Sequence, residues 1–289
     1  MNSLDRQPAR TPAVPLVPLH GVQTEAAEGG MFGHAVWQQV RDTALDVSRR
    51  EPLLLRRMQQ LVLRHAGPAA ILASVLARRM ASEDLPEPVL QELMQRVLES
   101  DESAMQHATR DLAAVKERDP ACTDLLHVVL NLKGYQALQA HRVGHALWRS
   151  GRKELAFALA SQASLAFAVD IHPAARIGSG VMLDHGTGIV IGETTVIEDD
   201  VSILQNVTLG GTGKEHGDRH PKIRSGVMIG AGAKILGNIE IGTMSKVAAG
   251  SVVLKPVPPH STVAGVPAKV VRRQQDDSCC PSMEMDQTI

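Results

Sequence analysis

The chain has 289 residues, 44% of them hydrophobic, and its 30 basic and 31 acidic residues leave a formal net charge of −1. This length allows one large domain or two ordinary ones, and the apolar content excludes a chain that is disordered throughout. The balanced charge excludes the overall positive field that would recruit nucleic acid or an anionic membrane. We therefore expect small molecules or proteins as binding partners.

Membrane insertion, secretion and disulfide bonding are not indicated either. No apolar stretch approaches the ~20 residues that a membrane span requires, and the N-terminus lacks the basic-then-apolar order of a secretory signal. The three cysteines, Cys122, Cys279 and Cys280, are too few and too awkwardly placed for a disulfide framework. The sequence therefore predicts a cytoplasmic protein.

Residues 1–31 hold four prolines, scattered polar residues and a Gly29–Gly30 pair, without sustained periodicity. We expect a flexible extension here. An organellar transit peptide is the alternative, but the acidic residues Asp5, Glu25 and Glu28 argue against it.

Residues 32–169 have the periodicity of helices. Apolar residues recur every three or four positions, for example within residues 36–44 and 90–97. Four prolines stand where helices would begin, because the first turn does not use the N–H that proline lacks: Pro52, Pro68, Pro86 and Pro120. The pattern predicts an all-α domain that serves packing and oligomerisation.

At Asp170 the period changes to six, with one eight-residue step after Leu183 and one fourteen-residue step after Leu209. The repeat consists of thirteen aliphatic positions: Ile171, Ile177, Leu183, Ile191, Ile197, Ile203, Leu209, Ile223, Ile229, Ile235, Ile241, Val247 and Val253. Glycine often follows these positions, and it readily adopts the positive φ of tight corners. Short strands joined by tight turns account for a period of six, whereas a helix does not.

Three hexads make one triangular coil, and successive coils stack at the ~4.8 Å spacing of paired strands with the aliphatic columns inside. Such an interior admits Ile, Val and Leu but hardly an aromatic ring, and no aromatic residue follows Phe167. The sequence predicts an α+β protein. A helical domain occupies residues 32–169, a parallel β-helix 170–271 and a flexible polar tail 272–289.

These residues resemble the hexapeptide-repeat acyltransferases, which assemble as trimers of left-handed parallel β-helices. Three stretches are similar to serine O-acetyltransferases in particular: DIHPAA at 170–175, LDHGTG at 183–188, and the segment 209–222 with GGTGK and GDRHPK. Residues 117–121 and 133–140 match the same family, and AGVPAK at 264–269 is shared more widely. The resemblance implies a left-handed β-helix and an enzyme that acetylates L-serine with acetyl-CoA, the first step from serine to cysteine, without a metal.

Acetyl transfer from a thioester to an alcohol needs a base of near-neutral pKa, and histidine is such a base. His185 lies in the eight-residue step, where two extra residues bulge from the prism, and the resemblance implies that it is the general base. Asp170 would orient its ring, as the third member of a hydrolase triad does. The alternative is that His185 caps a turn. No Ser or Cys is well placed as a nucleophile, so we expect direct attack by the alcohol.

Serine is a zwitterion, so a selective pocket needs both anionic and cationic groups. Asp119 and Asp184 match the family's ammonium-binding acids, while Arg219 and His220 match its carboxylate contacts, and His220 is also a candidate catalytic residue. Structural alternatives exist: Asp119 would cap a following helix, and Arg219 would pair with Asp218.

The loop 210–222 projects from the prism and, in a homotrimer, would reach a neighbour's His185, so the resemblance implies active sites shared between chains. Trimers would pair further into a dimer of trimers. The candidate coenzyme A contacts are four small residues and one candidate phosphate contact: Gly211, Thr212, Ala231, Ala249 and Lys246. The alternative is that the small ones serve turn geometry alone.

The polar tail ends in Ile289. In serine acetyltransferases a C-terminal isoleucine inserts into the active site of O-acetylserine sulfhydrylase, so the resemblance implies this enzyme as a partner. It also implies feedback inhibition by L-cysteine in the serine site.

Three alternatives stay open at this point. Another hexapeptide O-acetyltransferase would acetylate sugars or antibiotics and would not need a zwitterion pocket. A zinc lyase like the γ-class carbonic anhydrases would use His172, His185 and His220, although its usual His-x₄-His arrangement is missing. A non-catalytic scaffold would regulate the sulfhydrylase, but it would need neither His185 nor Asp170.

Overall fold

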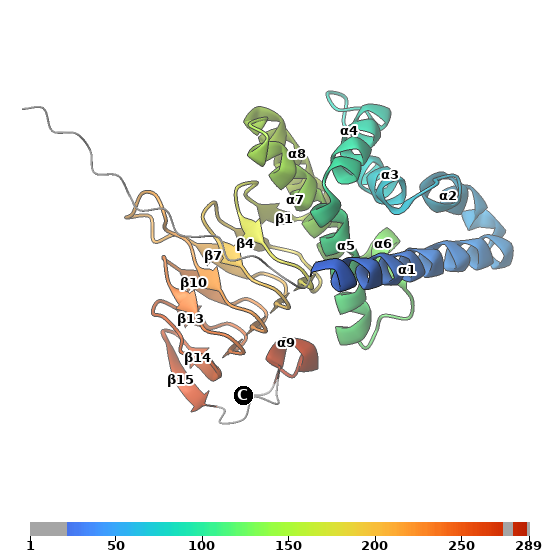
Figure 1. Ribbon diagram of the computed structural model, residues 1–289. Helices are drawn as coiled ribbons and strands as arrows, with labels where there is room; N and C mark the ends of the chain where they lie inside the picture. Colours follow the sequence, from blue (N-terminus) through green and yellow to red (C-terminus); the bar gives the residue numbers. More distant parts are fainter. Residues whose placement is uncertain (1–21, 274–279, 288–289) are drawn as a thin grey trace, which may run out of the picture.

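A computed structural model describes residues 22–273 and 280–287 of the chain. Figure 1 shows helices, in blue to green, beside a stack of short strands that runs from yellow to red. The order of an α-helical region followed by a parallel β-helix confirms the predicted fold class. Within the described ranges, no helix is long and apolar enough to cross a membrane.

The helical region begins earlier than residue 32. Its α-helices are α1 (Val22–Arg50), α2 (Leu55–Met58), α3 (Pro68–Met80), α4 (Glu87–Ser100), α5 (Glu102–Arg118), α6 (Leu125–Asn131), α7 (Lys133–Arg149) and α8 (Lys153–Phe167). A 3₁₀ turn at Pro52–Leu54 and a π-helical turn at Gln59–Leu63 flank α2. Residues 22–31 belong to α1, because the run of Gln, Glu and Ala before the glycine pair consists largely of helix formers. Residues 1–21 of the expected extension lie outside the described residues.

Prolines mark three of the four predicted helix starts. Pro52 opens the 3₁₀ turn, Pro68 opens α3 and Pro86 is the N-cap of α4. The prediction of a helix start at Pro120 is wrong. There the Asp119 carboxylate accepts the Ala121 amide proton at 2.8 Å and forms a turn, and α6 begins only after its own cap, Asp124.

Three parallel sheets form the faces of the prism (Figure 1), and each strand from β1 to β10 pairs with the third strand after it, whereas β12 pairs with β14. Sheet A contains β1 (Val169–Ile171), β4 (Ile189–Ile191), β7 (Thr208–Gly210), β10 (Lys234–Leu236) and β13 (Val252–Val253). Sheet B contains β2 (Arg176–Ile177), β5 (Val196–Ile197), β8 (Lys222–Ile223) and β11 (Glu240–Ile241). Sheet C contains β3 (Met182–Leu183), β6 (Ser202–Ile203), β9 (Met228–Ile229), β12 (Lys246–Val247) and β14 (Ser261–Gly265), and the antiparallel β15 (Ala268–Arg273) closes it.

The predicted aliphatic columns form the interior of the β-helix. In sheet A, Ile171 lies opposite Ile191, which lies opposite Leu209, and the column continues through Ile235 to Val253. Of the thirteen predicted positions, all are buried except Ile177, which is partly buried at the end that faces the helices. The period of six therefore identified the residues of the β-helix core correctly.

A buried ion pair joins the helical region to the first coil. Arg142 of α7 contacts Asp111 of α5 at 2.6 Å, and both side chains are almost completely buried. Asp111 also accepts the Val181 amide proton, while Arg142 donates to the carbonyl of Gly178. Breaking such a pair leaves an uncompensated buried charge, which costs about 3–5 kcal/mol. The junction that positions β3 is therefore held by charge as well as by packing.

The described part of the C-terminal tail packs on the rest of the chain. Helix α9 (Pro281–Glu284) lies against α5, and its Ser282 carbonyl accepts a hydrogen bond of 2.9 Å from the Ser202 hydroxyl of β6. Arg118 donates to the sulfur of Met283 and to the carbonyl of Gly180. This segment differs from the flexible tail expected from residue 272, because its Met and Pro side chains bury apolar surface. Residues 274–279 and Ile289 lie outside the described residues.

Candidate active site

The first irregular step of the repeat places His185 at the corner between sheets C and A. His185 has φ of 55°, and Gly186 and Gly188 also have positive φ, so the chain turns sharply outward between β3 and β4. The His185 side chain is 70% exposed, and its Nε2 lies 3.7 Å from a carboxylate oxygen of Asp184. An exposed imidazole beside a carboxylate is free to accept a proton from a bound ligand.

The backbone behind His185 rests directly on the first turn of α7. A Cβ atom added to Gly134 would lie 1.9 Å from the carbonyl oxygen of Leu183, and one added to Gly186 would lie 3.1 Å from the Cα of Gly134. Lys133 also donates to the Thr187 hydroxyl. This backbone-to-backbone contact, which only glycine permits, sets the position of the His185 loop.

We expect Gly134→Ala to lower the kcat of the acetyl transfer expected from the sequence about 100-fold. The added methyl group would push Leu183 and the His185 loop away by about 1 Å. Gly144→Ala is the matched control on the same helix, since its Cβ would have no neighbour closer than 4.0 Å. The control should keep kcat and stabilise α7 by about 1 kcal/mol. Steady-state kinetics and thermal unfolding of both variants test this, and equal kcat values would contradict the proposed role of the contact.

Three of the predicted site residues line one cavity of about 950 Å³: Asp119, Asp184 and His185. Burial raises the pKa of the Asp184 carboxyl; the nearby His185 opposes that rise and the Asp119 carboxylate adds to it. Two carboxylates facing one cavity attract a cationic group, because a positive charge between them offsets both their burial and their mutual repulsion. The cavity therefore suits a ligand that carries an ammonium group and a proton to give away.

The C-terminal segment also lines this cavity, which the sequence did not indicate. Met283, Met285 and Gln287 line the cavity together with Asp119 and His185. The only signal available in the sequence was Pro281, a residue that often opens a helix, because Met283 and Met285 are two positions apart and do not share one helical face.

Asp170 lies on the outer surface of sheet A, where its Cα pairs with that of Val190. In the described part of the chain, no hydrogen bond joins Asp170 to His185. Its proposed orienting role therefore requires the exposed imidazole to turn toward sheet A.

The second irregular step carries Arg219 and His220 to the corner between sheets A and B. Arg219 forms an ion pair with Glu193 at 2.7 Å, whereas Asp218 pairs with Lys222, so the alternative of an Arg219–Asp218 pair is wrong. The His220 ring lies on the coil where Gly192 leaves room, since a Cβ at Gly192 would be 2.0 Å from that ring.

The hydrogen bonds of His220 define its tautomer. The Thr194 amide donates to Nδ1 at 3.2 Å, so in the neutral ring the proton sits on Nε2. Burial, followed by the charge of Arg219, lowers the pKa of His220 and favours the neutral form. Beside the Arg219 guanidinium, His220 thus presents an N–H donor suited to a carboxylate or carbonyl oxygen.

The two groups of site residues lie at opposite ends of β4. His185 precedes this strand and Gly192 follows it, and residues 188 to 192 span about 13 Å at ~3.3 Å per residue. One small zwitterion cannot touch both groups within a single chain. Across residues 22–273 and 280–287, no three or more His, Cys, Asp or Glu side chains are placed to hold a metal ion, so His172, His185 and His220 do not form a common ligand set.

The candidate contacts of coenzyme A also lie at two different corners of the β-helix. Gly211 and Thr212 follow β7 at the corner between sheets A and B, whereas Ala231 and Ala249 follow β9 and β12 at the corner between sheets C and A. The Ala231 carbonyl accepts the Gly250 amide proton, which shows that these two corners are stacked. Lys246 is buried on β12.

Family comparisons match both parts of the chain. Residues 36–140 match the family "Serine acetyltransferase, N-terminal", and residues 220–255 match "Bacterial transferase hexapeptide (six repeats)". The serine acetyltransferase of Salmonella typhimurium is 53% identical over 87% of this chain and 92% of its own length.

Solved structures agree with this match. A serine acetyltransferase in complex with cysteine is 49% identical, with a TM-score of 0.86, over 89% of this chain and 99% of that one. The soybean serine acetyltransferase complexed with serine is 50% identical, with a TM-score of 0.82, and covers 83% and 99%. The enzyme from Brucella abortus in complex with coenzyme A is 48% identical, with a TM-score of 0.81, and covers 83% and 96%.

Proposed function

The chain belongs to the serine acetyltransferase family and is an acyltransferase, and we propose that it transfers acetyl from acetyl-CoA to the hydroxyl of L-serine, giving O-acetyl-L-serine and CoA. The observation that carries this proposal is the meeting of Asp119, Asp184 and His185 at one cavity. Two carboxylates and an imidazole there match an amino alcohol, which brings one ammonium group and one hydroxyl.

His185 acts as the general base in this proposal. It accepts the serine hydroxyl proton while the oxygen attacks the thioester carbonyl, so that the new C–O bond replaces the C–S bond. The same imidazolium then returns the proton to the CoA thiolate. Asp170 orients the ring and stabilises the imidazolium once His185 turns toward it. The 70% exposure of the His185 side chain supports such a turn, because little packing opposes it.

Serine is recognised from its two charged ends. Asp119 and Asp184 bind the ammonium group, and their mutual repulsion is relieved when that cation enters. Arg219 and His220 bind the carboxylate, for which Arg219 exchanges its Glu193 partner and His220 offers its Nε2 proton. The soybean relative complexed with serine supports this choice of substrate.

The complete site requires a neighbouring chain. Because β4 lies between the two residue groups within one chain, the His185 corner of one subunit faces the Arg219–His220 corner of the next in a homotrimer. The helical regions of two such trimers would then pair into a hexamer. CoA lies along the same boundary, with Gly211 and Thr212 from one chain and Ala231 and Ala249 from the other, and Lys246 as a phosphate contact. The Brucella abortus relative in complex with coenzyme A supports this co-substrate.

L-cysteine inhibits by occupying the serine site, since its ammonium and carboxylate groups are those of serine. The relative in complex with cysteine supports this inhibitor. Partnership with O-acetylserine sulfhydrylase through Ile289 is part of the same proposal, although Ile289 lies outside the described residues.

A thiol-release assay tests the proposed reaction. We expect release of CoA from acetyl-CoA with L-serine, none above background with a galactoside, and competition by L-cysteine against L-serine. Acetylation of the galactoside without turnover of L-serine would replace the proposed substrate by a sugar. Turnover of neither acceptor would favour the non-catalytic scaffold.

A further inference from the structure

Thr194, the third residue after β4, lies between the end of that strand and the loop that carries Arg219 and His220. Its hydroxyl oxygen accepts the backbone amide proton of Arg219 at 3.0 Å and that of His220 at 3.1 Å. The same oxygen lies 2.9 Å from Nδ1 of the His220 ring. One hydroxyl therefore contacts the backbone of both candidate carboxylate-binding residues and the ring of one of them.

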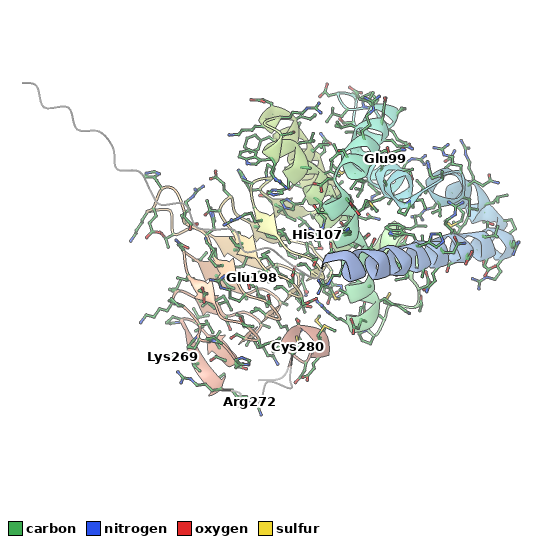
Figure 2. All side chains as sticks on the ribbon, viewed as in Figure 1. Glu99, His107, Glu198, Lys269, Arg272 and Cys280 are labelled. Atoms are coloured by element: carbon green, nitrogen blue, oxygen red, sulfur yellow. The ribbon has the colours of Figure 1, made fainter. Side chains whose placement is uncertain are left out.

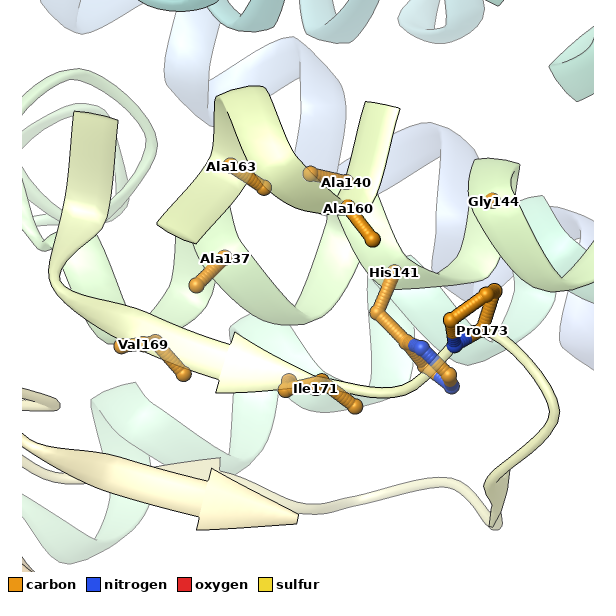
Figure 3. Close-up of a pocket in the computed structure, with 9 residues that line it drawn as sticks. All are labelled: Ala137, Ala140, His141, Gly144, Ala160, Ala163, Val169, Ile171 and Pro173. Carbon is orange, nitrogen blue, oxygen red and sulfur yellow. The ribbon is translucent and has the colours of Figure 1, made fainter. Parts of the chain in front are cut away.

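The coils around Thr194 hold its backbone in place. β5 begins two residues after Thr194, and Figure 2 shows Glu198, which directly follows β5, on the stack of strands. Figure 3 shows Ile171 and Pro173 of the preceding coil beside a cavity of only about 10 Å³, which holds at most one water. The Thr194 carbonyl also accepts a hydrogen bond of 3.0 Å from Nζ of Lys222. The hydroxyl is therefore presented to the loop from a well-packed corner of the β-helix.

The Thr194 hydroxyl also decides which nitrogen of His220 carries the proton. Both lone pairs of the hydroxyl oxygen face amide protons, so it has none left to accept an N–H of the ring. Its own proton is directed to Nδ1 of His220 or to the Asp218 carboxylate, which are both within reach. In either case Nδ1 stays unprotonated, and the neutral ring carries its proton on Nε2.

We propose that Thr194 is a positioning residue for the carboxylate of the amino-acid substrate, an inference that rests on the proposed function. Its hydroxyl holds the loop backbone and the His220 tautomer, so that the Arg219 guanidinium and the His220 N–H are both available to one carboxylate. The serine carboxylate takes no part in the reaction, so these contacts are the same in the ground state and the transition state. Loss of the hydroxyl therefore weakens serine binding and leaves the chemical step nearly unchanged.

The next residue, Thr195, provides a matched control on the same turn. Its side chain is 1% exposed, and its hydroxyl has no hydrogen-bond partner within the described residues. Thr195→Val therefore removes a hydroxyl from the same corner without removing a contact of the loop. This variant should keep the wild-type KM values for both substrates.

Steady-state kinetics of the full-length assembled enzyme test the inference. We expect Thr194→Val to raise the KM for L-serine about 10- to 100-fold, as the loss of a hydrogen bond to a charged group does. The kcat at saturating L-serine and the KM for acetyl-CoA should stay close to their wild-type values. Thr194→Ser keeps the hydroxyl and should restore the KM for L-serine. Inhibition of Thr194→Val by L-cysteine should weaken in parallel, because L-cysteine has the same carboxylate.

Thr194→Ala removes the same hydroxyl and should raise the same KM, so the test stays decisive if Thr194→Val fails to assemble in size-exclusion chromatography. Three results would overturn the inference and leave the proposed function intact: an unchanged KM for L-serine in an assembled variant without the hydroxyl, no recovery in Thr194→Ser, or an equal rise in Thr195→Val. A wild-type enzyme that does not acetylate L-serine would instead overturn the proposed function, and the inference with it.

Discussion

Replacement of His185 by asparagine is expected to lower kcat for serine acetylation by about 10²–10⁴-fold, the contribution of a positioned general base. Asparagine is preferable to alanine because residue 185 has φ of 55°, a left-handed conformation that asparagine tolerates better than most residues. The variant should therefore keep its fold and its KM for L-serine while it loses the group that accepts the hydroxyl proton. CoA release at saturating acetyl-CoA and L-serine measures the loss.

The matched control is His34→Asn, which changes an exposed histidine on α1. Its kcat should equal that of the wild-type chain. A His185→Asn enzyme that retains more than a tenth of the wild-type kcat would show that another group accepts the proton, and the role of His185 would then reduce to capping its turn.

Mixing two inactive variants is expected to restore activity if the site is shared between chains. His185→Asn and His220→Asn should each be nearly inactive as pure assemblies. When both are expressed together, a site is intact wherever a chain with native His185 stands next to one with native His220. Random assembly of a cyclic trimer makes about a quarter of its sites intact, so about a quarter of the wild-type kcat should return.

The same experiment distinguishes a shared site from one contained in a single chain. If all site residues acted within one chain, each chain of the mixture would carry one lesion and the mixture would stay inactive. Because His220 is buried against Gly192, its variant needs a check of assembly by size-exclusion chromatography. Arg219→Ala, whose side chain is partly exposed, provides a second partner for His185→Asn. Failure of both mixtures in correctly assembled trimers would refute the shared site.

Much of the fold was predictable because a β-helix repeats one short-range rule. Every sixth residue from Ile171 to Val253 points inward, apart from two longer steps, and twelve of these thirteen side chains are buried. The absence of aromatic residues after Phe167 agreed with the narrow interior. The two breaks in the count located the two corners that carry His185 and His220.

The errors in the prediction occurred where local signals compete. Pro120 resembles a helix start, but the Asp119 side chain closes a turn first, and the helix begins at Leu125. The alternative in which Arg219 pairs with Asp218 is also wrong, because the coil brings the end of β4 next to the loop and Arg219 pairs with Glu193. The packing of α9 beside the candidate site was missed because four helical residues give too short a pattern to recognise.

The sequence alone determined the fold class, the aliphatic columns of the β-helix and the residues that carry the proposed chemistry. The first two follow from spacing along the chain, which periodicity shows directly, whereas the site residues follow from the resemblance to the serine acetyltransferases. Only the tertiary structure decided that Gly134 touches the His185 loop, that α9 lines the cavity of Asp119 and Asp184, and that β4 separates His185 from His220. Each of these contacts joins segments far apart in the chain. These arrangements depend on how the surfaces of folded elements pack together, and the local spacing of residues does not encode this packing.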